Sequence, residues 1–400
     1  MGEGARGRRP LPPSPKPPPP TPIRGKIYGE VGTRGPAFPS NFSFYITGQG
    51  RQALHGKCYN FIMSVSFLPP PETVGAILIW HQGALGDLLL AGPALAAVRK
   101  RYPQARITAL GQPERWALLV PELSLAAVWD SGEAQWASLY SEAEPPPVLR
   151  ERLAAFQLAL VFGPRPQGVL LQNLARAGIP RVHWIPSFSE GGREPVAEMQ
   201  ARHLAGLGLE YEPQIFSLGW AAKADSGWVD GEGPWLAVAP GSGNPKKNWP
   251  LSHFYEAARA LAWEQRMGVI WLAGPAEAAI LPYVEGLAAA QGQVVAAGQS
   301  LGQVAAILSR CRLYLGNDAG LTHLAAAAGA GQVVAIFGPT DSRVWGPRGE
   351  NVTIMQGTCE LAPCAEGREI SCPEPRCLEG LTPAMVVDAA GAKLAESSSS

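Results

Sequence analysis

The sequence predicts an α/β protein with two doubly wound domains, each a parallel sheet covered by helices. From residue 75 onward, short apolar β-type runs alternate with segments of helical period, a pattern that favours parallel sheets joined by right-handed crossovers. The alternation stops in the Gly- and Asp-rich stretch 221–234 and then restarts. A chain of 400 residues also exceeds the usual size of one hydrophobic core. We therefore predict domains over 71–225 and 230–396.

Residues 1–70 are predicted to form a disordered, basic, Pro-rich extension. The segment 11–22 has eight prolines in twelve residues, which favours an extended, polyproline-like chain. Met63 would be a natural start just ahead of the first strand, so residues 1–62 are either such an extension or an over-called gene start. A basic targeting peptide is the alternative, and the prolines disfavour it because they prevent an amphipathic helix.

The net charge of zero hides two segments of opposite sign. Residues 1–62 carry nine basic and two acidic residues, so the other 24 basic and 31 acidic residues leave the rest of the chain mildly acidic. This charge argues against a nucleic-acid-binding protein. The sequence has no run of 18 apolar residues, and no signal-peptide core precedes the first strand, so we expect a cytoplasmic protein.

The first half begins with a strand and an amphipathic helix. Apolar residues then recur at steps of three and four from Leu88 to Tyr102, which predicts one helical face, and Pro93 should kink this helix or delay its regular part. A second helical pattern covers 193–208. Short apolar runs predict the strands of this half at 76–80, 105–111, 125–130, 157–164 and 181–185.

The second half repeats strand and helix more regularly. Strands, each with the turn after it, are predicted within 235–242, 268–275, 293–298, 312–318 and 332–340. The segment 277–289 reads as a helix with an internal Pro282, and the helix 320–329 should end at a glycine cap. The remaining predicted helices cover 251–265 and 301–311.

Ligands of doubly wound sheets bind beyond the carboxyl ends of the strands, so the turns there hold the candidate site residues. The turn 240–250, "PGSGNPKKNWP", offers Ser242, Gly243 and Lys247: a hydroxyl, an open backbone and a point charge, as a diphosphate requires. A solvated surface loop is the alternative. Glu277, after the next strand, could accept hydrogen bonds from a ribose or a base, or it is an ordinary first-turn acid stabilised by the helix dipole.

The turn "GNDAGLTHLAAAAG" at 316–329 resembles a general anion site at a helix N-terminus. Asp318 is expected to cap this helix, while Ala319 and Gly320 leave room for an anion near the first N–H groups. His323 could reach the same anion, or it is a hydrogen-bonded histidine on a half-buried face.

The fourth turn, "FGPTDSRVWGP" at 337–347, places Thr340 and Asp341 toward the cleft, unless its Gly-Pro pair only forms a tight turn. Together, the four turns predict a nucleotide-diphosphate pocket. The chain has no G-x-G-x-x-G at the first turn of either domain and no G-x-x-x-x-G-K-[ST], which disfavours nicotinamide or flavin enzymes and P-loop NTPases.

Asp87 is an isolated acid at the join of the first strand and helix. It lies in "HQGALGDLLLAGPAL" at 81–95, and no other acid follows before Glu114. As an N-cap it would contribute about 1 kcal/mol to the helix. As a carboxylate facing a phosphate pocket across a cleft, it could act as a general base, with Gly86 allowing close approach.

Four segments of the chain together resemble glycosyltransferase family 9, the ADP-heptose:lipopolysaccharide heptosyltransferases. They are "LGDLLLAGPALAAVRKRYPQARITALG" and the turns at 240–250, 316–329 and 337–347, and the resemblance spans 75 to about 387. It implies a GT-B fold with a central cleft, an acceptor site in domain 71–225 and a donor site in domain 230–396. It also implies inverting transfer of a heptose from ADP-heptose to an inner-core sugar of lipopolysaccharide or a similar glycan.

The family's functional residues carry over to matching positions. Asp87 maps to the proposed general base, Lys247 and Ser242 to the donor phosphate turn, and Glu277 to a residue near the adenosine. The match in "GNDAGLTH" places Asp318, Gly320 and His323 near the diphosphate. Inverting transfer needs one base and fixed cations or N–H groups at the leaving diphosphate, so no cofactor and no catalytic metal ion is expected beyond the ADP-sugar donor.

The resemblance has one clear departure, on the acceptor side. The stretch "HQGAL" has no Lys or Arg where family members often carry a basic or hydroxyl residue, which does not favour a phosphorylated, strongly anionic acceptor. A lipid-linked glycan acceptor would place the protein at the cytosolic face of the inner membrane, although the acidic folded part offers no basic patch. A GT-B-like sugar-nucleotide epimerase and a non-catalytic nucleotide-sugar binding protein are the alternatives.

Four cysteines near the C-terminus form a separate cluster in the sequence: Cys359, Cys364, Cys372 and Cys377. Their spacings of four, seven and four residues are loose for a zinc site, so structural thiols or a local disulfide are the favoured readings over a metal. The cluster lies beyond the last pocket turn, and we expect no catalytic role for it.

Overall fold

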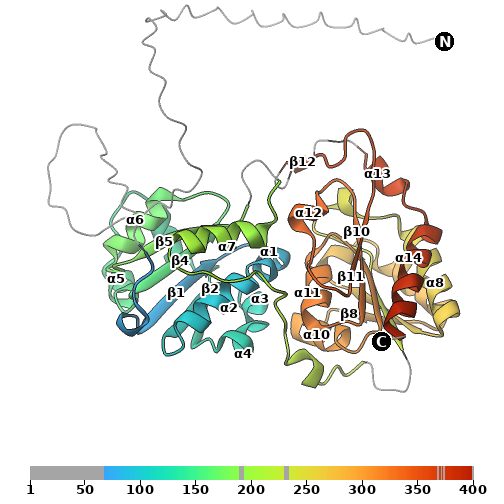
Figure 1. Cartoon of the computed structure of the whole chain (residues 1–400), viewed down its shortest axis with the longest axis horizontal. Coiled ribbons are helices and arrows are strands. Elements are labelled where there is room, and N and C mark those ends of the chain that lie inside the picture. The colour runs from blue at the N-terminus through green and yellow to red at the C-terminus, as the bar shows by residue number, and fades with distance from the viewer. Residues whose placement is uncertain are drawn as a thin grey trace, which may run out of the picture. The chain divides into compact units, whose positions relative to one another are not determined.

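Two parallel β-sheets flanked by helices form the frame of the protein, as the sequence predicts (Figure 1). The structure is a computed structural model. It describes residues 67–188, 193–228, 234–366, 369–370, 372 and 374–398. Nearly all of the predicted extension 1–70 lies outside the described residues. Within the described residues, every helix is too short or too polar to cross a membrane.

The first sheet has the order β3-β2-β1-β4-β5 in the described residues, with all strands parallel. The chain runs outward from β1 to β3 and then returns to the other side of β1, so the strand order reverses at the carboxyl end of β1. This switch point is where ligands of such sheets bind. The strands are β1 (Ala76–His81), β2 (Arg106–Gly111), β3 (Ala127–Asp130), β4 (Leu158–Gly163) and β5 (Val182–Pro186).

The first predicted helix of this half is interrupted close to its proline. The predicted helix from Leu88 to Tyr102 is in fact two helices that meet at Ala91, and Pro93 lies in the first turn of the second, where its missing N–H costs nothing. The helices α5 and α6 have no counterpart in the sequence prediction. The elements are α1 (Leu85–Leu90), α2 (Gly92–Arg101), α3 (Pro113–Ala117), α4 (Val120–Leu123), α5 (Pro147–Leu153), α6 (Gly168–Arg176) and α7 (Val196–Gly206), with short turns η1 (Pro71–Thr73) and η2 (Ala134–Tyr140).

The second sheet has the order β11-β10-β9-β6-β7-β8 in the described residues, again all parallel. Its order reverses between β6 and β9, so a second switch point lies at the ends of these two strands. The edge strand β11 was not predicted from the sequence. The strands are β6 (Trp235–Ala239), β7 (Gly268–Ala273), β8 (Val294–Ala297), β9 (Leu313–Asn317), β10 (Gln332–Phe337) and β11 (Val352–Gln356).

Two predictions for the helices of the second half have different outcomes. The predicted helix over 277–289 is wrong at its start: α9 begins at Leu281, so Pro282 lies in its first turn rather than inside it. The predicted glycine cap is confirmed, because α11 ends at Gly329 with φ 82°. The elements are η4 (Pro245–Lys247), α8 (Leu251–Gln265), η5 (Pro275–Glu277), α9 (Leu281–Ala289), α10 (Leu301–Leu308), α11 (Gly320–Ala328), α12 (Ser342–Trp345), α13 (Arg376–Glu379) and α14 (Pro383–Ser398), with a small hairpin of β12 (Ala365–Glu366) and β13 (Glu369–Ile370).

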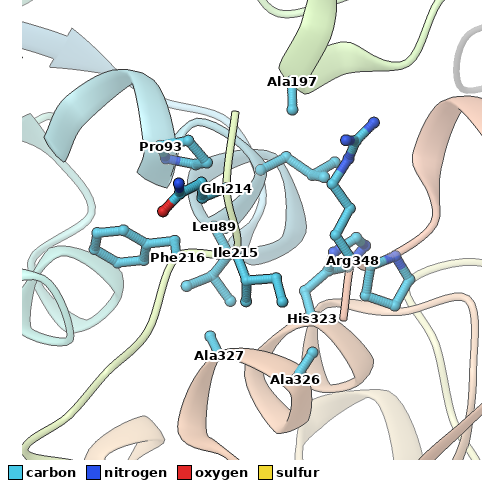
Figure 2. A pocket seen from close by; sticks show the side chains of 12 residues that line it. Leu89, Pro93, Ala197, Gln214, Ile215, Phe216, His323, Ala326, Ala327 and Arg348 are labelled. Atoms are coloured by element: carbon cyan, nitrogen blue, oxygen red, sulfur yellow. The ribbon is translucent and has the colours of Figure 1, made fainter. Parts of the chain in front are cut away.

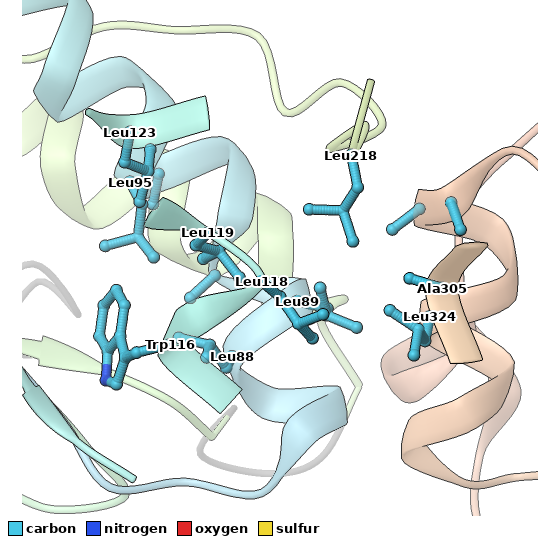
Figure 3. Close-up of a cluster of buried hydrophobic side chains, with 14 of the residues drawn as sticks. Leu88, Leu89, Leu95, Trp116, Leu118, Leu119, Leu123, Leu218, Ala305 and Leu324 are labelled. Atoms are coloured by element: carbon cyan, nitrogen blue, oxygen red, sulfur yellow. The ribbon is translucent and has the colours of Figure 1, made fainter. Parts of the chain in front are cut away.

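A continuous apolar core connects the helices beside the two sheets. Leu89 of α1, Leu324 of α11 and Ala305 of α10 belong to one buried cluster (Figure 3). The chain between the sheets packs on the same cluster, since Leu218 is buried there and its N–H donates to Ala327 O at 2.7 Å. This connecting segment is therefore held in place before the predicted linker 221–234 begins.

Candidate active site

A cavity of 300 Å³ opens where the carboxyl ends of both sheets meet. Its walls come from the turn and first helix after β1, the turns after β6, β9 and β10, and two aromatic residues. Of the predicted site residues, the cavity is lined by Asp87, Gly243, Lys247, Asp318, Ala319, Gly320, His323 and Thr340. Ser242 and Glu277 do not line it.

Two glycines allow the N-terminal ends of α1 and α11 to approach closely. A Cβ atom on Gly320 would lie 2.8 Å from Leu85 Cβ, and one on Gly86 would lie 3.0 Å from His323 Cδ2. Neither position has room for a larger side chain without a shift of the neighbour. This contact brings Asp87 of one helix and His323 of the other to the same cavity.

Asp87 holds the start of its own helix from the third helical position. Its Oδ2 accepts a hydrogen bond from the N–H of Ala84 at 2.9 Å, and Ala84 is the N-cap residue of α1. The predicted N-cap role is therefore wrong, because the helix begins three residues earlier than that role requires. The carboxylate reaches back to the cap instead, which fixes its orientation at the cavity wall.

Two further side chains form hydrogen bonds with the turn before Asp87. His81, at the end of β1, accepts a hydrogen bond from Gly83 N–H through Nδ1 at 3.3 Å. Arg115 of α3 donates to Gly83 O at 2.7 Å. A Cβ on Gly83 would lie 2.7 Å from His81 Cε1 and 2.9 Å from Asp87 Cβ, so only glycine fits between these side chains.

His81 is an uncharged histidine beneath the candidate base. It is 2% exposed, and burial lowers its pKa to about 4, although the negative charge of Asp87 acts in the opposite direction. Sequence reasoning missed both His81 and Arg115. The signal for the first was a polar residue ending an otherwise apolar strand, whereas nothing in the sequence pointed to the second.

Lys247, Asp318 and Thr340 form a charged group on the opposite wall. Lys247 Nζ lies 2.7 Å from Asp318 Oδ2, and the Thr340 hydroxyl donates to the same oxygen. Asp318 is 8% exposed and does not cap α11, whose N-cap residue is Ala319 with no side-chain cap. The predicted capping role is wrong because the carboxylate is turned toward the lysine. It holds the ammonium group at the cavity wall.

His323 lies between the two walls. Burial lowers its pKa, while Asp318 and Asp87 act in the opposite direction and Lys247 adds to the lowering. Charged groups from both halves of the chain therefore act on this ring, and burial favours its uncharged form. Figure 2 shows a second, smaller cavity that His323 also lines, together with the apolar side chains of Leu89 and Phe216.

Glu277 and Ser242 form hydrogen bonds with the turn 240–249 from outside the cavity. The two oxygens of Glu277 accept from Gly241 N at 2.9 Å and Gly274 N at 2.8 Å, and the side chain is 2% exposed. Its pKa is raised by burial, and these hydrogen bonds oppose the shift. Ser242 Oγ lies within hydrogen-bonding distance of both Asn244 O and Asn248 Oδ1, either of which can accept its single proton. Direct contacts of either residue with a donor stay predictions.

Asn317, which sequence reasoning missed, also fixes this turn. Its side chain is fully buried, accepts from Trp249 N at 2.8 Å and donates to Pro240 O at 2.7 Å. Both ends of the turn 240–249 are therefore fastened to β9. An amide at the end of a buried strand is the signal that could have found it.

The four clustered cysteines are free thiols in the described part of the chain. Burial, together with a smaller effect of the other three thiols, raises the pKa of Cys377 to about 11, so the four side chains lie near one another. The described residues contain no group of three or more side chains arranged to hold a metal ion. None of the four lines the cavity.

The comparisons with known proteins point to one family. Residues 199–374 match the model of "Glycosyltransferase family 9 (heptosyltransferase)". The structure resembles a family 9 glycosyltransferase of Veillonella parvula, with 19% identity, a TM-score of 0.66 and coverage of 83% of this chain and 99% of that one. It also resembles E. coli ADP-heptose lps heptosyltransferase II, with 18% identity, a TM-score of 0.60 and coverage of 81% and 99%. At these identities the likeness establishes the fold, which is GT-B. No curated protein matches the sequence.

Proposed function

Because this chain belongs to glycosyltransferase family 9, and is therefore a glycosyltransferase, we propose that it transfers a heptose from ADP-heptose to a sugar hydroxyl of a lipopolysaccharide inner core or a similar glycan. The donor would bind to the domain 230–396 and the acceptor to the domain 71–225. A lipid-linked acceptor places the reaction at the cytosolic face of the inner membrane.

The single observation that carries this proposal is the division of one cavity between a carboxylate and an anion-binding wall. Asp87 stands on one side, and Lys247 with the N-terminus of α11 stands on the other. Such a wall stabilises the negative charge of a leaving diphosphate. A base on the opposite side suits inverting transfer, in which the attack and the departure occur on opposite faces of the sugar.

The reaction then needs one proton transfer and one displacement. Asp87 takes the proton of the acceptor hydroxyl, and the resulting oxygen attacks the anomeric carbon of the donor sugar. As the new glycosidic bond forms, the bond to the diphosphate breaks and ADP leaves with the bonding electrons. Lys247 and the N–H groups of Ala319 and Gly320 hold the charge that develops on the diphosphate. No metal ion takes part in this scheme.

Replacing the base tests the proposal most directly. The variant Asp87→Asn should lower kcat by about 10²- to 10⁴-fold, because an amide cannot accept the proton. The affinity for ADP-heptose, measured by calorimetry, should stay unchanged. Asp130→Asn is the matched control, since Asp130 also ends a strand of the first sheet but does not line the cavity.

The outcomes separate the assignments. If Asp87→Asn transfers at the wild-type rate while the donor binds, Asp87 is not the base. If the wild type binds neither ADP nor ADP-heptose, the donor proposal fails. A parallel screen of UDP- and GDP-sugars identifies the nucleotide, and conversion of a sugar nucleotide without any acceptor would identify an epimerase.

A further inference from the structure

We propose that Phe188 and Trp345 form an acceptor subsite that stacks on an uncharged sugar ring, so that the acceptor sugar is neutral rather than acidic or phosphorylated. The inference rests on the proposed function, because it treats the Asp87 side of the cavity as the acceptor side. It goes beyond that function by naming two residues that contact the acceptor and the chemical class of acceptor that they select.

The two rings form one aromatic wall of the cavity. Phe188 follows β5 and Trp345 ends α12, and their ring centroids lie 4.9 Å apart with an interplanar angle of 64°. Both line the same cavity as Asp87, and Leu90 continues their surface. Flat apolar faces beside a few polar groups are typical of sites for small molecules with mixed polar and apolar surfaces, such as a sugar ring.

The aromatic wall packs on buried apolar side chains. Trp345 packs on a buried cluster formed by Leu90 of α1, Val196 and Met199 of α7, and Val344 of α12. The indole is therefore packed against buried side chains from both halves of the chain. A ring fixed in this way loses little conformational freedom when a sugar stacks on it.

The charges around the cavity oppose an anionic acceptor. Among the described residues that line it, Lys247 is the single Lys or Arg, and its ammonium group already lies 2.7 Å from Asp318. Asp87 adds a negative charge on the acceptor side. Within this described lining, a sugar carboxylate or phosphate would face like charge with no second Lys or Arg to compensate it.

Three arginines on the segments around this cavity have acidic or carbonyl partners of their own. Arg348 pairs with Glu198, and Arg343 lies 2.7 Å from Asp341. Arg115 donates to the carbonyl of Gly83. The turn 82–84, which faces the acceptor side ahead of Asp87, consists of Gln, Gly and Ala. A neutral ring with hydroxyl groups fits these surroundings better than an anion does.

The test measures binding of simple glycosides to the full chain in saturating ADP. The probes are a neutral methyl heptoside or hexoside, a methyl glycoside of a sugar acid, and a methyl hexoside phosphate, observed by saturation-transfer NMR and calorimetry. The neutral glycoside should bind more tightly than either anion. Trp345→Ala and Phe188→Ala should each weaken its binding by about tenfold, and Trp345→Phe by less. ADP affinity should not change.

Trp263→Ala is the matched control, because Trp263 of α8 is 86% exposed and does not line the cavity. Tighter binding of an anionic glycoside, wild-type binding by the Phe188 and Trp345 variants, or no glycoside binding by the wild type would each overturn the subsite. Phe188→Ala spares the buried cluster and keeps the test decisive if Trp345→Ala unfolds. If ADP fails to bind but the neutral glycoside binds through Trp345, the donor proposal fails and the subsite stands.

Discussion

At the scale of single residues, the turn 240–249 contains two adjacent lysines with different partners. Lys247 points at the cavity and pairs with Asp318, whereas Lys246 donates through Nζ to Ile370 O and Cys372 O, away from it. The sequence shows only "KK". Which lysine faces the cavity is decided by the buried carboxylate of Asp318, which is 71 residues further along the chain.

Lys247→Met should therefore raise the Kd for ADP by about 10- to 100-fold, the range expected for losing a hydrogen bond to a charged group. Lys246→Met is the matched control and should leave ADP affinity unchanged, although it removes two hydrogen bonds to the hairpin region. Calorimetry with each purified variant measures both values. Equal losses in the two variants would contradict the assignment of Lys247.

The residues found from the sequence share one property, and so do those that were missed. Asp87, Lys247 and Asp318 lie in or just after the segments that connect a predicted strand to the next helix, where the geometry of a parallel sheet makes a site expected. Trp345 belongs to a short helix after such a turn, and Arg115 to a helix. These two reach the site or its supporting turn only through tertiary packing, which no local pattern encodes.

At the scale of elements, the contact between α1 and α11 determines how the two walls of the cavity are spaced. Gly320→Ala would place a Cβ atom 2.8 Å from Leu85 Cβ, so α1 must move or tilt. The variant should lose about 1–3 kcal/mol of unfolding free energy, as overpacked cores do. It should also lower kcat, because Asp87 moves with its helix.

Gly391→Ala in α14 is the matched control, since nothing lies within 4 Å of the added Cβ. It should raise stability by about 0.5–1 kcal/mol, because alanine favours a helix more than glycine does. Urea unfolding and steady-state kinetics measure both effects. Unchanged stability and kcat in Gly320→Ala would show that the close approach is not needed.

The elements that the sequence did not predict also have a physical explanation. Strand β11 lies at an edge of the sheet, and all its residues are only half-buried, so its apolar signal is weak. Helix α14 packs on α8 at the far end of the chain, where no strand–helix repeat remained to suggest it. Central strands such as β9, which are wholly buried, were found because burial on both faces requires a continuous apolar run.

At the scale of the whole molecule, buried histidines should make stability depend on pH. His81, His183 and His203 each have a pKa lowered from 6.5 to about 4, with burial as the largest cause. Between these two pH values the unfolded chain binds protons that the native protein does not. The free energy of unfolding must therefore fall as the pH decreases from 6.5 toward 4, and each histidine contributes a slope of up to about 1.4 kcal/mol per pH unit.

Urea unfolding at pH 7.5, 6.5, 5.8 and 5.2 tests this expectation above the range in which most carboxylates titrate. The variant His183→Phe removes one of the three groups at a fully buried position of β5 and should reduce the slope by about one proton, or 1.4 kcal/mol per pH unit. It also leaves the cavity intact, so its ADP affinity at pH 7.5 should match that of the wild type. A free energy of unfolding that stays constant from pH 6.5 to 5.2 would mean that these rings are already protonated in the native protein or become accessible to water.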